Sequence, residues 1–304
     1  MIPPPAFGLP RQAEASPVRI SGQDTSELEA AVEALSRDPG LPEAMSDYAN
    51  RVTRLYADAP GAVAMMGDLG RFGVLAAMFC LPTPVTRAAM VAAIGPGVAG
   101  RARVTSHLNA LEKAGVIEAT PFAGRAQPLR PSAWLEGWMA RWLEAMSLPS
   151  RHWWREVCAP PALSRDLLVL YLRQVLDANR EGLDAFAPTP AVGRMMTLVG
   201  GHLFVLELVQ VTEALARLDE PVGFSRRAFA RRFGISRAHV VDLCAEAARL
   251  GWLIRSDDRR LVVSRAFGED LRRWTAIHFV LSNATQAGRL LPLMRGAAVP
   301  RPGA

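Results

Sequence analysis

Most of this chain consists of two copies of one pattern. Four blocks recur in the same order, and the small gaps between them fall at turns. The matched pairs are PGAVAMM (60–66) with PAVGRMM (190–196), FGVLAAMFCL (72–81) with HLFVLELVQV (202–211), VTRAAMVAAIG (85–95) with FSRRAFARRFG (224–234), GRARVTSHLNALEKAGVI (100–117) with SRAHVVDLCAEAARLGWL (236–253), and LRPSAWLEGWMARW (129–142) with LVVSRAFGEDLRRW (261–274), the first two forming one block. Such a repeat predicts a tandem duplication, so the fold must contain two similar units and their connections.

The sequence of each copy predicts a short capped helix, then a glycine turn, and then a second helix that ends at glycine. The hydroxyl of Thr86 or Ser225 is expected to cap the short helix, and the preceding Val85 or Phe224 to staple it. In the second helix the positions at helical spacing are Val104, His107, Leu108 and Leu111 in one copy, and Val240, Leu243, Cys244 and Ala247 in the other. A strand, a turn, a second strand and a last helix follow.

This order resembles the winged helix-turn-helix transcriptional regulators, particularly the MarR-like group. The residues that carry the resemblance are ISRAHVVDLCAEAARLGWLIRSDDRRLVV and GRARVTSHLNALEKAGVIEATPFAGRAQPLR, and it covers roughly 60–147 and 190–281. It implies a mainly α fold with small β-hairpin wings, in which two tandem winged helix-turn-helix domains are joined by a helical linker region. MarR-like chains usually have one such unit and dimerise. Pro121, Pro128 and Pro131 are expected to weaken the first wing.

The domain boundaries follow from composition and periodicity. The predicted parts are a mobile tail (1–23), N-terminal helices (24–59), winged helix domain 1 (60–150), a helical linker (151–189), winged helix domain 2 (190–285) and a second tail (286–304). In the N-terminal helices, a short acidic helix begins near Asp24 and a longer one covers about 42–58. Residues 1–59 carry five arginines and nine acidic residues, which is unfavourable for DNA.

Positive charge gathers in the two copies. The chain has a formal net charge of +6, and Lys113 is its single lysine. Residues 221–281 contain twelve arginines and six acidic residues, and residues 82–147 contain seven basic and four acidic residues. Guanidinium groups suit bidentate contacts with phosphate, so the second copy is expected to supply more of the affinity for nucleic acid.

The resemblance implies a sequence-specific double-stranded DNA-binding transcriptional regulator. Its recognition helices, at about 100–113 and 236–249, would read the major groove from their N-terminal turns. The expected base-reading residues are Arg101, Thr105, Ser106, Asn109, Ser236 and Arg237. The expected DNA-backbone contacts are Arg87, Arg103, Arg125, Arg226, Arg227, Arg231, Arg232, His239, Arg255, Arg259 and Arg260.

Other hypotheses about the function remain open. A tandem winged-helix replication initiator and a protein-binding winged-helix scaffold share the predicted fold. The face formed by Trp134, Trp138 and Trp142, with Trp153 and Trp154 beyond it, would serve as an effector pocket or a dimer seam, although core packing between two lobes is the favoured interpretation. A homodimer and an unidentified small-molecule effector are therefore both open.

Enzymes and membrane proteins are disfavoured. The five histidines show no metal-ligand spacing, and His107 is expected to be a satisfied buried histidine. The sequence contains no phosphate loop and no nucleophile elbow, so no catalytic activity, metal or cofactor is expected. Cys80, Cys158 and Cys244 are expected to be small buried side chains in a reducing compartment. MIPPPAFGLP does not have the form of a signal peptide, and no apolar run is long enough to span a bilayer, so a cytoplasmic protein is expected.

Overall fold

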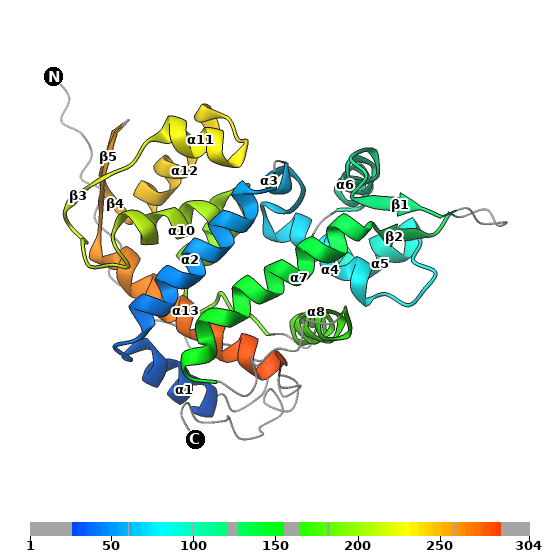
Figure 1. Ribbon diagram of the computed structural model, residues 1–304, viewed down its shortest axis with the longest axis horizontal. Coiled ribbons are helices and arrows are strands. Elements are labelled where there is room, and N and C mark those ends of the chain that lie inside the picture. The colour runs from blue at the N-terminus through cyan, green and yellow to red at the C-terminus, as the bar shows by residue number, and fades with distance from the viewer. Residues whose placement is uncertain are drawn as a thin grey trace.

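Among the residues that the structure describes, 69% are helical, and the helices are accompanied by two small antiparallel sheets. Figure 1 shows the computed structural model. It describes residues 26–59, 61–98, 100–120, 127–154, 165–180, 183–257 and 259–286. The predicted tail at 1–23 lies outside these ranges, as does 287–304 of the predicted C-terminal tail.

The two predicted N-terminal helices are present. They are α1 (Ser26–Ser36) and α2 (Leu41–Ala57), whose bounds agree closely with the predicted ones. Pro42 lies in the first turn of α2, where its missing N–H leaves no intrahelical bond unmade. Nine residues of α2 are buried, so this helix belongs to the core of the molecule.

Two runs of elements follow, and they have nearly the same order. The first run is α3 (Ala62–Met66), α4 (Leu69–Cys80), α5 (Arg87–Val98), α6 (Arg101–Lys113), β1 (Ile117–Ala119), β2 (Leu129–Pro131) and α7 (Ala133–Ser147). The short helix η1 (Leu148–His152) and α8 (Arg165–Arg180) connect it to the second run. The second run is α9 (Pro190–Met196), α10 (Gly201–Val211), β3 (Pro221–Gly223), α11 (Arg226–Phe233), α12 (Arg237–Arg249), β4 (Leu253–Ser256), β5 (Arg260–Val263) and α13 (Arg265–Gln286).

Local signals set the bounds of the matched helices. The Thr86 hydroxyl accepts a hydrogen bond from the Ala89 N–H at 3.1 Å, and the Ser225 hydroxyl accepts one from the Ala228 N–H at 3.2 Å. Each hydroxyl therefore satisfies a backbone N–H in the first turn of its helix. After α6 and α12 the chain turns at Gly115 and Gly251, whose φ angles of 68° and 79° favour glycine.

The two sheets differ in extent. In the second run the strand order is β3-β5-β4, with Val222 opposite Leu261. In the first run β1 pairs with β2 over three residues, and one isolated bridge between Val85 and Leu129 stands where the third strand would be. Pro131 lies in β2 and has no N–H to donate, in keeping with the predicted weaker hairpin.

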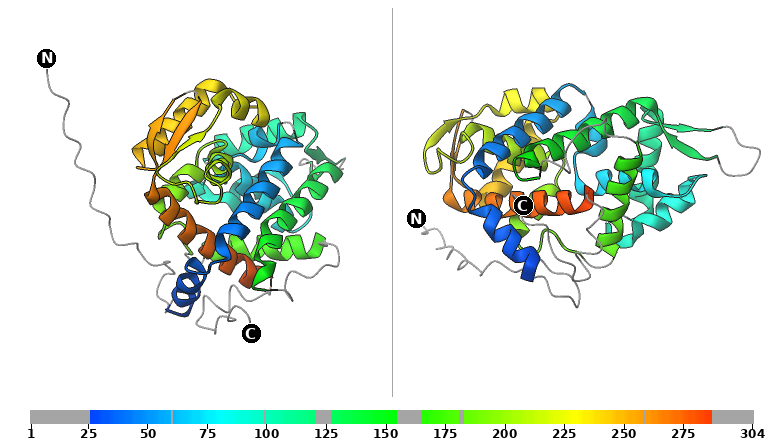
Figure 2. Two further views of the ribbon diagram at one scale, coloured as in Figure 1. Left: turned by 60° about the vertical axis from the view of Figure 1, so that its left-hand side comes forward. Right: turned by 60° about the horizontal axis from the view of Figure 1, so that its bottom comes forward.

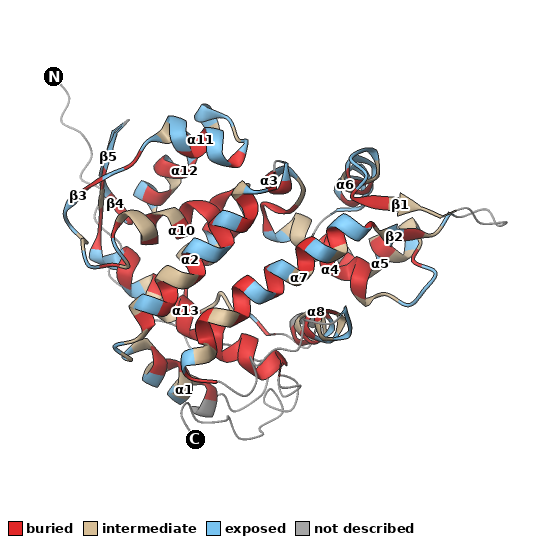
Figure 3. Ribbon diagram, in the orientation of Figure 1, coloured by how far each residue is buried: buried red, intermediate tan, exposed pale blue. Residues whose placement is uncertain are grey.

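Helix α2 lies between the two runs (Figure 1). It contacts α7 of the first run and α10, α11 and α13 of the second, while α8 contacts α4, α7 and α13. The buried residues of α2, α7 and α13 form the centre of the molecule, as Figure 3 shows. Both runs therefore share one core.

The tryptophans belong to this core. Trp138, Trp142, Trp153 and Trp154 are buried, and only Trp134 of the predicted face is exposed. Trp142 contacts the Phe72 ring with centroids 4.6 Å apart, and Trp138 contacts Tyr56 at 5.1 Å. The favoured interpretation of core packing is confirmed for these four side chains. Of the cysteines predicted to be buried, Cys244 is buried, Cys80 is half-buried, and Cys158 lies outside the described residues.

No single helix among the described residues is long and apolar enough to cross a bilayer. The pair α9 and α10 would pass by length and composition together, but it is bent by 119°.

Tyr48 of α2 contacts both runs at once. Its hydroxyl donates to Met146 Sδ of α7 at 3.1 Å and lies 3.0 Å from His202 Nε2 of α10. Its ring lies 5.3 Å from the His278 ring and 6.0 Å from the Phe279 ring, both on α13. Burial raises the pKa of Tyr48 well above its usual value, so the hydroxyl stays protonated.

Tyr48→Ala should therefore destabilise both runs together. Loss of a large buried aromatic side chain is expected to lower the free energy of unfolding by about 3–5 kcal/mol. Because both runs lose contacts with the same side chain, calorimetry should show one transition at a lower temperature. Two separate transitions, with only one of them shifted, would contradict a shared core.

Two buried histidines lie beside Tyr48 in their neutral form. Burial lowers the pKa of His202 to about 4 and that of His278 to about 3, from the ordinary 6.5, and His202 contributes to the shift of His278. The unfolded chain therefore binds these protons at a higher pH than the folded chain does. The contribution of the two neutral histidines to the free energy of unfolding is complete above pH 6.5. It is lost as the pH falls from 6.5 toward the pKa values of the folded chain.

The free energy of unfolding should accordingly fall with acidification. The slope should approach about 1.4 kcal/mol per pH unit for each histidine between the two pKa values. His202→Gln keeps a polar partner for the Tyr48 hydroxyl but does not titrate, so urea unfolding should show a shallower dependence between about pH 6.5 and 5. Identical slopes for the variant and the wild type would show that His202 does not titrate on unfolding.

Candidate nucleic-acid interface

The helices predicted to meet DNA, α6, α11 and α12, lie in the upper half of Figure 1, while the β4–β5 and β1–β2 hairpins lie at its left and right edges. Figure 2 (left view) likewise shows α11 at the top and α1 at the bottom. Helix α5 contacts α6, and α11 contacts α12. Val104, Leu108 and Leu111 of α6 are buried, as are Val240 and Leu243 of α12, so the opposite faces of both helices remain exposed (Figure 3).

The front of α12 combines a cap with an exposed arginine. The Ser236 hydroxyl accepts from the His239 N–H at 3.1 Å and so caps the helix. Arg237, Ala238 and Val241 are exposed. A base-reading role for Ser236 would compete with its capping bond, whereas the Arg237 side chain has no hydrogen-bond or ion-pair partner among the described residues.

Six exposed arginines of the second run, Arg237 included, lack a side-chain partner among the described residues. None of them forms a side-chain hydrogen bond or a salt bridge with any part of the chain that the structure describes. They are Arg227 and Arg231 of α11, Arg237 of α12, and Arg255, Arg259 and Arg260 of the β4–β5 hairpin. Most other described arginines are paired, for example Arg249 with Glu246 at 2.6 Å and Arg265 with Asp219 at 2.7 Å.

Three residues predicted to contact the DNA backbone from the second run are engaged within the protein. Arg226 is half-buried and donates to the Ser256 hydroxyl at 2.7 Å. Arg232 pairs with Glu207 at 3.1 Å and lies over the Phe233 ring. The His239 ring lies 2.6 Å from the Val199 carbonyl oxygen, in the α9–α10 turn. These contacts hold α11 and α12 in place, so the predicted phosphate contacts of Arg226, Arg232 and His239 would require these bonds to break.

In the first run, Arg101 and Thr105 are exposed on α6 as predicted, and Ser106 is exposed at the rim of a cavity. Arg87, however, donates to Asn109 Oδ1 at 2.8 Å and also pairs with Glu112. Arg103 reaches back to Asp68 at 3.4 Å. Arg125 lies outside the described residues.

The predicted site residues of the first run thus separate into two groups. Arg101 and Thr105 are available to a ligand in solution. Arg87, Asn109 and Arg103 are held by partners on α4, α5 and α6, so their predicted DNA contacts would require these bonds to break.

Acidic groups organise the interface locally. Asp257 accepts hydrogen bonds from the backbone N–H groups of Arg259 and Arg260, both at 2.8 Å, and these bonds lower the pKa of its carboxyl. The Asp257 carboxylate therefore satisfies two backbone N–H groups between β4 and β5. Hydrogen bonds from Arg249 and Arg194 lower the pKa of Glu246 to about 2, and the Arg194–Glu246 pair joins α9 to α12 at 2.6 Å.

Two features were not predicted. Asp68 is a buried carboxylate that caps α4 and accepts from the Arg71 N–H at 2.9 Å, and its position just before an apolar helix was the available signal. His107, predicted to be satisfied in the core, is half-buried, and its Nε2 makes no hydrogen bond of normal geometry within the described residues. Burial lowers the pKa of its ring, with Arg71 adding to the effect, while Asp68 and the Met65 backbone oppose it.

The described residues contain no group of three or more His, Cys, Asp or Glu side chains that could hold a metal ion. No family model, curated protein or solved structure matches the chain. Only the geometry of the chain itself therefore points to a function.

Proposed function

We propose that this protein is a sequence-specific double-stranded DNA-binding transcriptional regulator built as two tandem winged helix-turn-helix units. Helices α6 and α12 act as recognition helices, and the β1–β2 and β4–β5 hairpins act as wings. The similar order of the two runs supports a duplication, as do the matched caps at Thr86 and Ser225 and the matched turns at Gly115 and Gly251.

The unpaired arginines of the second run carry the proposal. A surface arginine usually gains a little from an ion pair with a neighbouring carboxylate. Here six are without such a partner in the described chain, and they lie together on α11, α12 and the β4–β5 hairpin. Exposed arginines without an internal partner suit contacts with DNA phosphates, because counterion release then supplies affinity.

The two units contribute unequally under this proposal. In the first unit, Arg87 and Arg103 are neutralised internally, which leaves Arg101 at the front of α6. The second unit therefore supplies most of the non-specific affinity. Both units place an arginine at the first position of the recognition helix, Arg101 and Arg237, where it can reach guanine in the major groove.

The proposal predicts different effects for two kinds of variant in a gel-shift assay with a salt series. Arg101→Ala and Arg237→Ala should each cost about 1–3 kcal/mol on the preferred site and relax the preference at one base pair. The double variant Arg227→Ala/Arg231→Ala should weaken binding to every sequence and reduce the salt slope by about 2. The preferred site is first selected from a random duplex library.

Arg37→Ala is the matched control. The Arg37 side chain is 76% exposed and directly follows α1, which lies at the end of the molecule opposite α11 (Figure 1). Its removal should leave the affinity and the salt slope unchanged. If the wild type shifts no duplex at low salt, the proposal is wrong and a protein-binding scaffold becomes the better account. If Arg37→Ala weakens binding as much as Arg227→Ala/Arg231→Ala does, the charge acts non-locally.

A further inference from the structure

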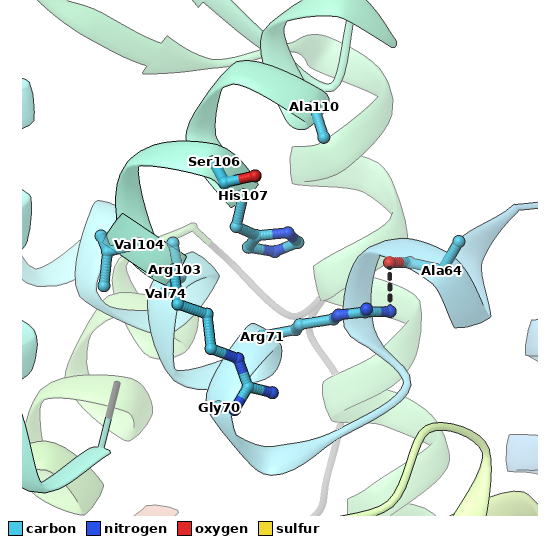
Figure 4. A pocket seen from close by; sticks show the side chains of 9 residues that line it. All are labelled: Ala64, Gly70, Arg71, Val74, Arg103, Val104, Ser106, His107 and Ala110. Carbon is cyan, nitrogen blue, oxygen red and sulfur yellow. Dashed lines mark hydrogen bonds between the residues drawn. The ribbon is translucent and has the colours of Figure 1, made fainter. Parts of the chain in front are cut away.

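A cavity of about 250 Å³ lies between α3, α4 and α6 (Figure 4). Its lining combines apolar and cationic side chains. The residues are Ala64, Gly70, Arg71, Val74, Arg103, Val104, Ser106, His107 and Ala110. The volume is many times the roughly 10–15 Å³ that one water needs and slightly below the range of about 300–1,000 Å³ for ligand pockets, so it suits a small molecule.

The corresponding place in the second run is filled. By the matched blocks, Val74 corresponds to Phe204 and His107 to Leu243, and both of these larger or apolar side chains are fully buried. Ala64 and Ala110 correspond to Arg194 and Glu246, which form an ion pair at 2.6 Å across the same gap. Where the first run has the cavity, the second thus has two fully buried side chains and an ion pair.

The charges around the cavity favour one negative charge in the ligand. Arg71 donates to the Ala64 carbonyl at 2.7 Å and lies 3.2 Å from Asp68, while Arg103 lies 3.4 Å from the other oxygen of Asp68. Two guanidinium groups therefore share one carboxylate, which leaves one positive charge in excess. Each keeps N–H groups that donate to no acceptor in the described chain. A carboxylate would accept from them, whereas a phosphate dianion would overcompensate.

We propose that this cavity is the binding site of a small organic monocarboxylate. Its carboxylate accepts hydrogen bonds from Arg71 and Arg103, and its apolar body contacts Ala64 and Ala110. Ser106 and His107 offer polar contacts at the wall. Because α6 forms one side of the cavity, the ligand would lie against a recognition helix, a consequence that rests on the proposed function. The binding site itself does not depend on DNA.

The test uses 4-methylpentanoate as the probe and titration calorimetry of the full chain without DNA. The wild type should bind the carboxylate at least about tenfold more tightly than 4-methylpentanamide, which has the same shape and no charge. The variant Ala64→Arg/Ala110→Glu transfers the ion pair of the second run to the rim of the cavity without changing the net charge. It should weaken binding of the carboxylate by about tenfold or more. Both alanines are exposed, so the fold should be retained.

Ala114→Glu is the control for an added acidic group on α6. Ala114 is exposed and lies one helical turn beyond Ala110, outside the cavity. Its substitution should change the affinity by less than about threefold. The inference is overturned if the wild type gives no heat up to about 10 mM probe, if the amide binds equally well, or if Ala64→Arg/Ala110→Glu binds as the wild type does. Since DNA is absent, none of these outcomes bears on DNA binding.

Discussion

The contact between Tyr48 and both runs is the constraint on which the rest of the structure depends. Its hydroxyl meets Met146 on one side and His202 on the other, and its ring packs against α13. Helix α2 packs against α7 of the first run and α10 of the second, so it gives the apolar faces of these two helices a common partner. Because both runs share this core, α6 and α12 belong to one body, which is what the proposed reading of two half-sites by a single chain requires.

Much of the fold could be predicted because its signals are local. The bounds of α6 and α12 differ by one residue at one end from the predicted helices, since a cap or a glycine marks each end. The central position of α2 could not be predicted in this way. Its amphipathic sequence is equally suited to a peripheral helix, and periodicity does not say which of several apolar faces it will meet.

In the candidate site, too, the features set by local sequence could be predicted and those set by contacts between distant segments could not. The exposure of Arg101 and Arg237 followed from the apolar stripe of their helices, which turns the first position outward. The engagement of Arg103 by Asp68, and of His239 by the Val199 carbonyl, depends on turns distant in the sequence. Arg103 and His239 occupy corresponding positions in the matched blocks. In both copies, a side chain in the first turn of the helix therefore contacts an earlier turn of the chain. Only the three-dimensional arrangement separates arginines that stabilise the protein from arginines that remain available to a ligand.

The central claim is that one chain presents two recognition helices to one duplex. The most direct measurement is footprinting on the selected site, combined with light scattering of the complex. Because α6 and α12 differ in sequence beyond their first two residues, the account predicts one chain per duplex and an asymmetric footprint of about two helical turns, with half-sites about 10 bp apart on one face. Two chains on a palindromic footprint, or one chain protecting a single half-site, would contradict it.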